Sequence, residues 1–180
     1  MTRRALIAAH REVLEQAQAL VGSLDAPTYT AAAPQAGLAS VGTHLRHLLD
    51  MYGCFVRGLA TGRVDYEARA RDARLEAEPA AGLAALRALS AELAALERAA
   101  LPERLLVHGD TPVGHEHERV WAASTPEREL QFLVNHTLHH FALIAAVLRL
   151  HGRAVPRDFG LAPSTIRWLA AGEESRACAQ

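Results

Sequence analysis

The sequence has few aromatic residues and few cysteines. Phe, Trp and Tyr make up 5% of the 180 residues, although 50% of the residues are hydrophobic. Alanine and leucine supply most of the hydrophobic residues, and few segments are rich in Val, Ile or Thr, a balance that favours helices over sheet. The two cysteines, Cys54 and Cys178, form no CxxC pair, and their spacing indicates no disulfide framework.

Excess charge of one sign and long apolar runs are also lacking. The 19 Lys and Arg residues nearly balance the 20 Asp and Glu residues, so no global field draws the chain to nucleic acid or to an anionic membrane. No uninterrupted apolar run reaches the ~18 residues of a membrane span. The N-terminal stretch MTRRALIAAHREVLEQ has charges every few residues and does not resemble a signal peptide. We therefore expect a cytoplasmic protein that binds neither nucleic acid nor membrane.

Apolar residues recur at helical spacing in four long segments. These segments are residues 3–22, 40–59, 79–101 and 126–151. Ser40 is the expected N-cap of the second segment, while Pro79 and Pro126 stand in first turns, where proline is tolerated. Four long helices joined by loops predict an all-α four-helix bundle, with a short additional C-terminal helix.

The chain length suits a single domain that spans residues 1–180. We expect its ordered core at about residues 3–170 and a flexible tail at 171–180. Between the long helices, Asp65 is the expected cap of a short solvated helix. Residues 103–124 contain two glycines and a proline, and we expect a loop there with one short extended piece.

Histidine is abundant where aromatic residues are rare, with ten in the chain. In the stretch NHTLHH, His136 and His140 are four residues apart and fall on one face of the last long helix, beside apolar neighbours. His139 falls on the outward face. A pair of histidines at this spacing is one way for a helix to present two imidazoles to one metal ion. The residue after His136 is Thr137, so the HExxH pattern of metalloproteases is absent.

A third ligand is available in the stretch VGTHLRHLLD, which contains His44 and His47. The helical wheel places His44 nearer the apolar side. Asp50 follows His47 by about one turn and could accept the other ring N–H of a ligand histidine, which favours His47. The residues alone leave this choice open. Glu129 shares the stripe of His136 and His140 but lies about 10 Å from His136 along the axis.

The other histidines have simpler interpretations. The cluster His115, Glu116, His117 and Glu118 lies in a polar stretch beside glycine and is best interpreted as a solvated turn. Three single histidines, His10, His108 and His151, are expected at the surface. The competing interpretation of the inward pair is a bundle without metal, in which the rings are buried and hydrogen-bonded.

Four stretches in this order resemble the DinB-like superfamily. They are SVGTHLRHLLDMY, VDYEARARD, RELQFLVNHTLHHFALIAAVLRLHG and VPRDFGLAPSTIRWL, and the resemblance extends from about residue 38 to 170. Members of that superfamily are four-helix bundles, often dimeric, and many bind a divalent metal through three histidines. The resemblance implies that the first ligand, in a pattern H-x-x-D/E, is His47 with Asp50, and that the others are His136 and His140. His44 remains the alternate.

The resemblance also suggests a class of activity. Characterised relatives include bacillithiol S-transferases and mycothiol-dependent isomerases, whose metal sites keep positions open for water or a thiol. It therefore implies a homodimer that binds zinc, nickel, iron or manganese and acts on a small molecule such as a thiol. We expect a metal-dependent thiol or group transferase, or a hydrolase. The alternative is a non-catalytic metal- or ligand-binding bundle, such as a sensor or a partner protein.

Overall fold

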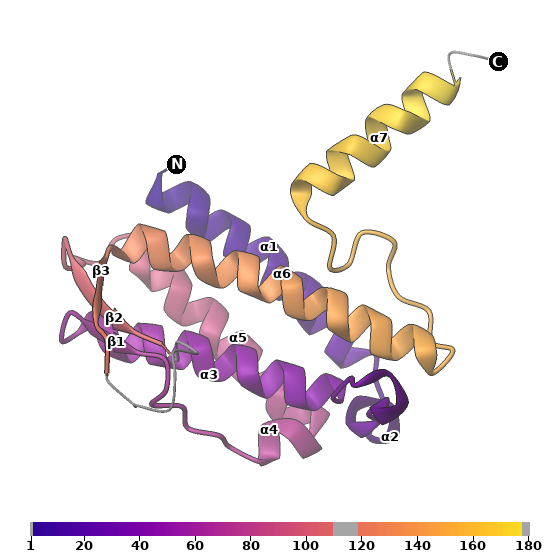
Figure 1. Ribbon diagram of the computed structural model, residues 1–180, viewed down its shortest axis with the longest axis horizontal. Coiled ribbons are helices and arrows are strands. Elements are labelled where there is room, and N and C mark those ends of the chain that lie inside the picture. Colours follow the sequence, from indigo (N-terminus) through magenta and orange to yellow (C-terminus); the bar gives the residue numbers. More distant parts are fainter. Residues whose placement is uncertain (1, 110–118, 178–180) are drawn as a thin grey trace.

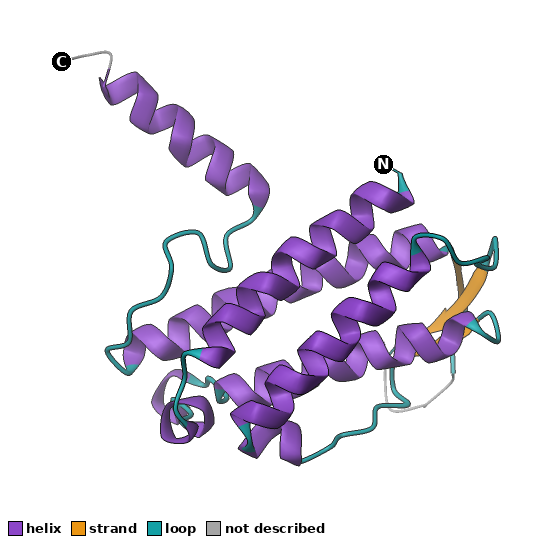
Figure 2. Ribbon diagram, turned by 180° about the vertical axis from the view of Figure 1, so that it is seen from behind, coloured by secondary structure: helices purple, strands orange, loops and turns teal. Residues whose placement is uncertain are grey.

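Four long helices form the body of the protein (Figures 1 and 2). They are α1 (Arg3–Gly22), α3 (Val41–Leu59), α5 (Pro79–Leu96) and α6 (Pro126–Leu150) in a computed structural model that describes residues 2–109 and 119–177. Helix α1 packs against α5 and α6, and α3 packs against the same two helices. The predicted four-helix bundle is therefore confirmed.

The helix ends follow local chemistry that the sequence makes visible. The Ser40 hydroxyl accepts a hydrogen bond from the Thr43 N–H at the start of α3, and Thr125 does the same for Arg128 at the start of α6. Pro79 and Pro126 are the first residues of α5 and α6, as predicted. Helix α5 ends at Leu96 instead of residue 101, and the Glu97 N–H bonds back to the last carbonyls.

The connections contain a small sheet, of which the sequence analysis predicted only one short extended piece, in residues 103–124. Strands β1 (Arg63–Asp65), β2 (Leu105–His108) and β3 (Ala122–Ser124) lie in that order, with β1 parallel and β3 antiparallel to β2. The prediction that Asp65 caps a helix is wrong, because Asp65 ends a strand whose central residue, Val64, is completely buried. Pairing with β2, some 40 residues along the chain, decided this conformation. The cluster from His115 to Glu118 lies outside the described residues.

Short helices complete the connections. Helices α2 (Ala26–Thr30) and η1 (Pro34–Ala36) link α1 to α3, and α4 (Arg74–Ala77) precedes α5. The C-terminal helix α7 (Pro163–Ala177) projects away from the bundle and includes residues 171–177, where we expected a tail (Figure 1). The segment before it is tied to α6, because the Phe159 ring stacks on Phe141 with their centroids 4.5 Å apart.

Two of the bundle helices, α5 and α6, are long and apolar enough by length and composition to cross a membrane. Core helices of water-soluble bundles meet the same criteria, so this is weak evidence for a span. Helix α6 packs against α1 and α3 and buries Leu130, Leu133 and Phe141 almost completely. This packing explains its hydrophobicity without a membrane.

Candidate metal centre

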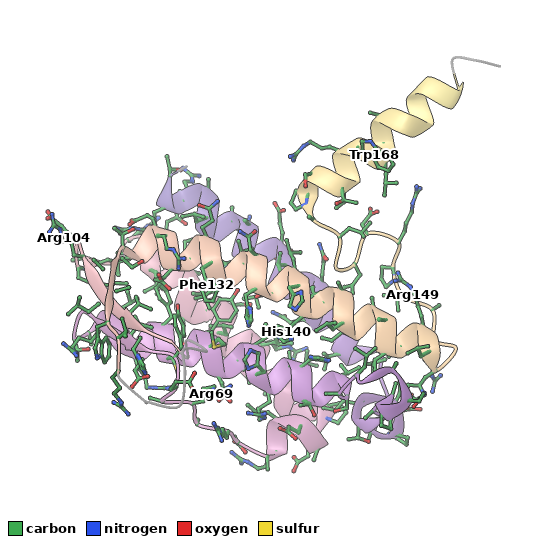
Figure 3. The ribbon with its side chains drawn as sticks, in the orientation of Figure 1. Arg69, Arg104, Phe132, His140, Arg149 and Trp168 are labelled. Carbon is green, nitrogen blue, oxygen red and sulfur yellow. The ribbon has the colours of Figure 1, made fainter. Side chains whose placement is uncertain are left out.

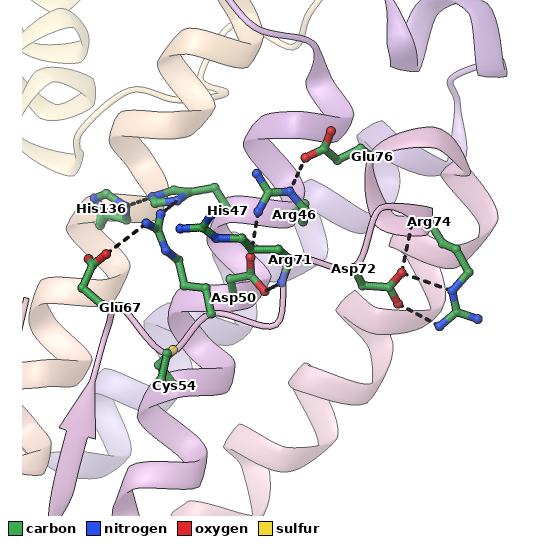
Figure 4. A network of polar contacts seen from close by, with 12 residues as sticks. Arg46, His47, Asp50, Cys54, Glu67, Arg71, Asp72, Arg74, Glu76 and His136 are labelled. Carbon is green, nitrogen blue, oxygen red and sulfur yellow. Dashed lines mark hydrogen bonds and ion pairs between the residues drawn. The ribbon is translucent and has the colours of Figure 1, made fainter.

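Three histidine rings from two helices meet between α3 and α6. His47 comes from α3, and His136 and His140 come from α6 (Figures 3 and 4). The Nε2 atoms of His47 and His136 are 2.9 Å apart, and the ring centroid of His140 lies 4.7 Å from that of His47 and 4.6 Å from that of His136. One ligand nitrogen from each ring can be chosen so that all three lie within 4.8 Å of one another.

This donor set fits a divalent ion. Two nitrogens that each lie about 2.05 Å from one ion are about 2.9 Å apart at a right angle and about 3.3 Å apart at the tetrahedral angle. The 2.9 Å separation of the His47 and His136 nitrogens falls at the short end of this range. Three imidazole ligands also leave coordination positions for water or substrate.

Burial keeps these rings neutral. It lowers the pKa of His47 from 6.5 to about 4, with smaller contributions from His136 and Arg69. It also lowers the pKa of His140 to about 3, assisted by the neighbouring His136 and His47 rings. The pKa of His136 is lowered for the same main reason. Neutral imidazoles present lone pairs, which is the form that binds metal ions.

His44 contacts the cluster through His140 and is not among the three converging rings. It is buried, and its Nδ1 atom lies 3.0 Å from Nδ1 of His140. Because His44 engages Nδ1 of His140, Nε2 is the nitrogen of that ring that can take an ion. Of the two candidates that the sequence left open, the structure brings His47 into the cluster and places His44 in contact with the His140 ring.

Asp50 binds arginine residues and not, as we had expected, the ring of His47. We expected its carboxylate to accept the ring N–H of His47, but it accepts from Arg46 Nη1 at 2.9 Å and from the Arg71 backbone N–H at 3.1 Å (Figure 4). Nδ1 of His47 instead contacts the Arg69 guanidinium, with Nη1 3.5 Å away. Asp50 therefore anchors the segment between β1 and α4, which carries Arg69, beside the histidine cluster.

Comparison with known proteins identifies the family. Residues 2–167 match the family model of the DinB family. The chain belongs to the DinB family. No curated protein sequence matches it. Among solved structures, it is similar to YfiT from Bacillus subtilis, described as a probable metal-dependent hydrolase with an unusual four-helix bundle topology. The TM-score is 0.60 at 21% sequence identity, over 84% of this chain and 89% of that one.

In this DinB family chain, Glu129 binds protein groups away from the three rings. Its carboxylate is completely buried and accepts hydrogen bonds from the Tyr66 hydroxyl at 2.8 Å, from the Ser124 hydroxyl and from Arg128. Burial and this carboxylate raise the pKa of Tyr66 well above its usual value. Glu129 thus fastens the small sheet to α6, and its position on the ligand stripe has a structural explanation.

The prediction that His10 lies at the surface is wrong. The ring is fully buried in the DinB family bundle, with Nδ1 2.8 Å from the Tyr52 hydroxyl and Nε2 3.0 Å from the Leu130 carbonyl. The sequence contains a clue to this position, because His10 is four residues after Leu6 and four before Leu14, both of them buried. His139 is exposed, as its place on the helix predicted.

Proposed function

We propose that this chain binds one divalent metal ion through His47, His136 and His140 and uses it for hydrolysis of, or group transfer to, a small molecule. The observation that carries the proposal is the convergence of three imidazole nitrogens, from two helices, within 4.8 Å of one another. The description of the similar solved structure as a probable metal-dependent hydrolase supports the same class of activity.

A divalent ion held by three neutral ligands keeps its full charge and lowers the pKa of a bound water or thiol, which yields a nucleophile near neutral pH. The chain's own residues would shape this chemistry. His44 contacts the outer nitrogen of His140 and would hold that ring in place. The Phe132 ring stacks on His136, with centroids 5.5 Å apart, and would restrict the orientation of that ring. Zinc, nickel, iron and manganese all accept imidazole ligands, so the donor set does not select among them.

One observation favours a second candidate, a non-catalytic metal-binding protein. Of the acidic residues that the sequence places near the ligands, Asp50 binds Arg46 and Arg71, and Glu129 binds Tyr66 and Ser124. Both carboxylates are therefore engaged in structural contacts and not placed as a general base. A sensor or a metal-dependent partner protein needs no such base.

The test begins with untagged protein and elemental analysis. Metal-loaded and metal-stripped samples are then screened against small esters, amides and thiol-transfer substrates. His136→Ala is the site variant, and His151→Ala, an exposed histidine bonded to the Ala32 carbonyl, is the matched control. We expect activity only in metal-loaded wild type and His151→Ala. Equal activity in the stripped protein or in His136→Ala would contradict the proposal, while stoichiometric metal without activity would favour the second candidate.

A further inference from the structure

The segment between β1 and α4 is fixed beside the histidine cluster by contacts with α3. The Arg71 N–H donates to Asp50 at 3.1 Å, and the Ala68 carbonyl accepts from Arg57 at 3.1 Å. Arg71 has a φ of 55°, a left-handed conformation that is uncommon for residues other than glycine. The two anchors thus hold a backbone shape that would otherwise be disfavoured, and this shape positions Arg69.

Arg69 directs its guanidinium to His47. Its Nη1 atom lies 3.5 Å from Nδ1 of His47, and its Nη2 atom donates to Glu67 at 3.2 Å. Its Nε atom is buried and has no hydrogen-bond partner within residues 2–109 and 119–177. A buried guanidinium nitrogen without an acceptor is unusual, because buried polar groups are nearly always paired.

The chemistry of His47 makes this contact a pair of donors. A neutral imidazole has one lone pair and one N–H. Nε2 of His47 faces the cluster, so when that atom is a metal ligand the proton is on Nδ1. Arginine nitrogens only donate. The His47 Nδ1–H and the Arg69 Nη1–H then face each other across 3.5 Å with no acceptor between them, and an oxygen that both groups can reach would satisfy both donors.

Two of the neighbouring arginines are already matched by carboxylates. Arg46 pairs with both Asp50 and Glu76, and Arg74 pairs with Asp72 at 2.7 Å (Figure 4). Arg69 has only Glu67, whose side chain is 35% exposed and can turn toward solvent. Among these arginines, Arg69 is the one whose guanidinium contacts His47, and it has donors to spare.

We propose that Arg69, together with the Nδ1–H of His47, binds an oxygen of a carboxylate or phosphate group on the substrate, so that this metal site selects anionic small molecules. This inference rests on the proposed metal binding by His47. Arginine suits the task, because its planar fork matches carboxylate and phosphate oxygens.

The test uses the full chain loaded with Co²⁺, whose visible absorption reports changes at the metal. Acetate, methyl phosphate and neutral acetamide are titrated into wild type, Arg69→Gln, Arg69→Lys and Arg74→Gln. Arg74→Gln is the matched control, because it removes the same charge from an exposed arginine five residues along the chain. We expect Arg69→Gln to bind one Co²⁺ normally but to bind one or both anions at least about tenfold more weakly. Acetamide binding should be equal in all four proteins, and the more affected anion identifies the substrate group.

Equal anion affinities in Arg69→Gln and Arg74→Gln, with Co²⁺ bound in both, would overturn this inference and leave the proposed function standing. A wild-type chain that takes up no Co²⁺ would overturn both. If Arg69→Gln does not fold, Arg69→Lys decides: it keeps the charge but lacks the fork, so unchanged affinity for both anions would contradict a role for the guanidinium.

Discussion

Two kinds of histidine environment occur in this bundle, and they differ in the groups that the ring nitrogens contact. His10 contacts a tyrosine hydroxyl and a backbone carbonyl, whereas the histidines between α3 and α6 contact one another. Burial lowers the pKa in both places, to about 4 for His10 and about 4 for His47. A lowered pKa alone therefore does not separate a histidine with a structural role from a candidate metal ligand.

The groups that contact the ring nitrogens distinguish His10 from the histidines of the cluster. The Leu130 carbonyl can only accept, so Nε2 of His10 donates and Nδ1 accepts from the Tyr52 hydroxyl. Both nitrogens of the neutral ring are thereby used by the protein. In the cluster, Nε2 of His47 lies 2.9 Å from Nε2 of His136, and a nitrogen of His140 lies within 4.8 Å of a nitrogen of each of these rings. Convergent imidazole lone pairs are what a divalent ion requires.

The largest effect should come from removing one ring of the cluster. We expect His136→Ala to weaken zinc binding by more than about 1,000-fold, since loss of an outer partner alone typically costs 10- to 100-fold. His10→Ala should bind zinc as wild type does. Competition with a chromophoric chelator measures both affinities. Unchanged affinity in His136→Ala would remove the distinction between the two kinds of histidine.

Replacing His10, which should not affect zinc binding, should instead lower the stability of the metal-free chain. His10→Ala leaves a cavity in the core and a buried Tyr52 hydroxyl without its partner, and we expect a loss of about 3 kcal/mol in the free energy of unfolding. Urea denaturation with circular dichroism measures this loss. A loss below about 1 kcal/mol would mean that the buried network contributes little.

Acid should weaken the metal-free fold through His10. The pKa of His10 is about 4 when folded and 6.5 when unfolded, so below pH 6.5 the unfolded chain binds a proton that the folded chain excludes. Its contribution to the free energy of unfolding should fall by about 1.6 kcal/mol between pH 6.5 and pH 5. Urea titrations at both values should show a steeper decline in wild type than in His10→Gln. An equal decline in the free energy of unfolding in wild type and His10→Gln would contradict the assignment of this acid sensitivity to His10.

The smallest expected effect concerns His44, which supports the cluster without joining it. His44→Ala removes the partner of Nδ1 of His140 and should weaken zinc binding by about tenfold. The matched control is His139→Ala, an exposed neighbour that should retain wild-type affinity. If His44→Ala loses as much zinc affinity as His136→Ala, then His44 is itself a ligand, and the choice of His47 over His44 as the ligand from α3 is wrong.

Local sequence patterns predicted the bundle well. Apolar spacing located the long helices, and Ser40, Pro79 and Pro126 set their starts, because caps and first-turn prolines act within a few residues. The strand at Asp65 could not be found in this way. It forms because β2 lies alongside, and β2 is far away in the sequence.

For the candidate site, the sequence predicted which helix face each histidine lies on, but not which side chains contact each ring. Helical spacing places His136 and His140 together and His139 outside, which the structure reproduces. Spacing cannot say which groups from other elements approach each ring. It therefore missed Arg69 beside His47, and the pairing of Asp50 with Arg71 in place of His47.

The most direct test of the central claim is an anomalous difference map at the zinc absorption edge, from crystals of the untagged protein grown with equimolar zinc. One peak should appear about 2.0–2.1 Å from a nitrogen of each of His47, His136 and His140, with none beside His10. A map in which His47 stays hydrogen-bonded to His136 and His140 to His44, with zinc absent or bound elsewhere, would contradict the account.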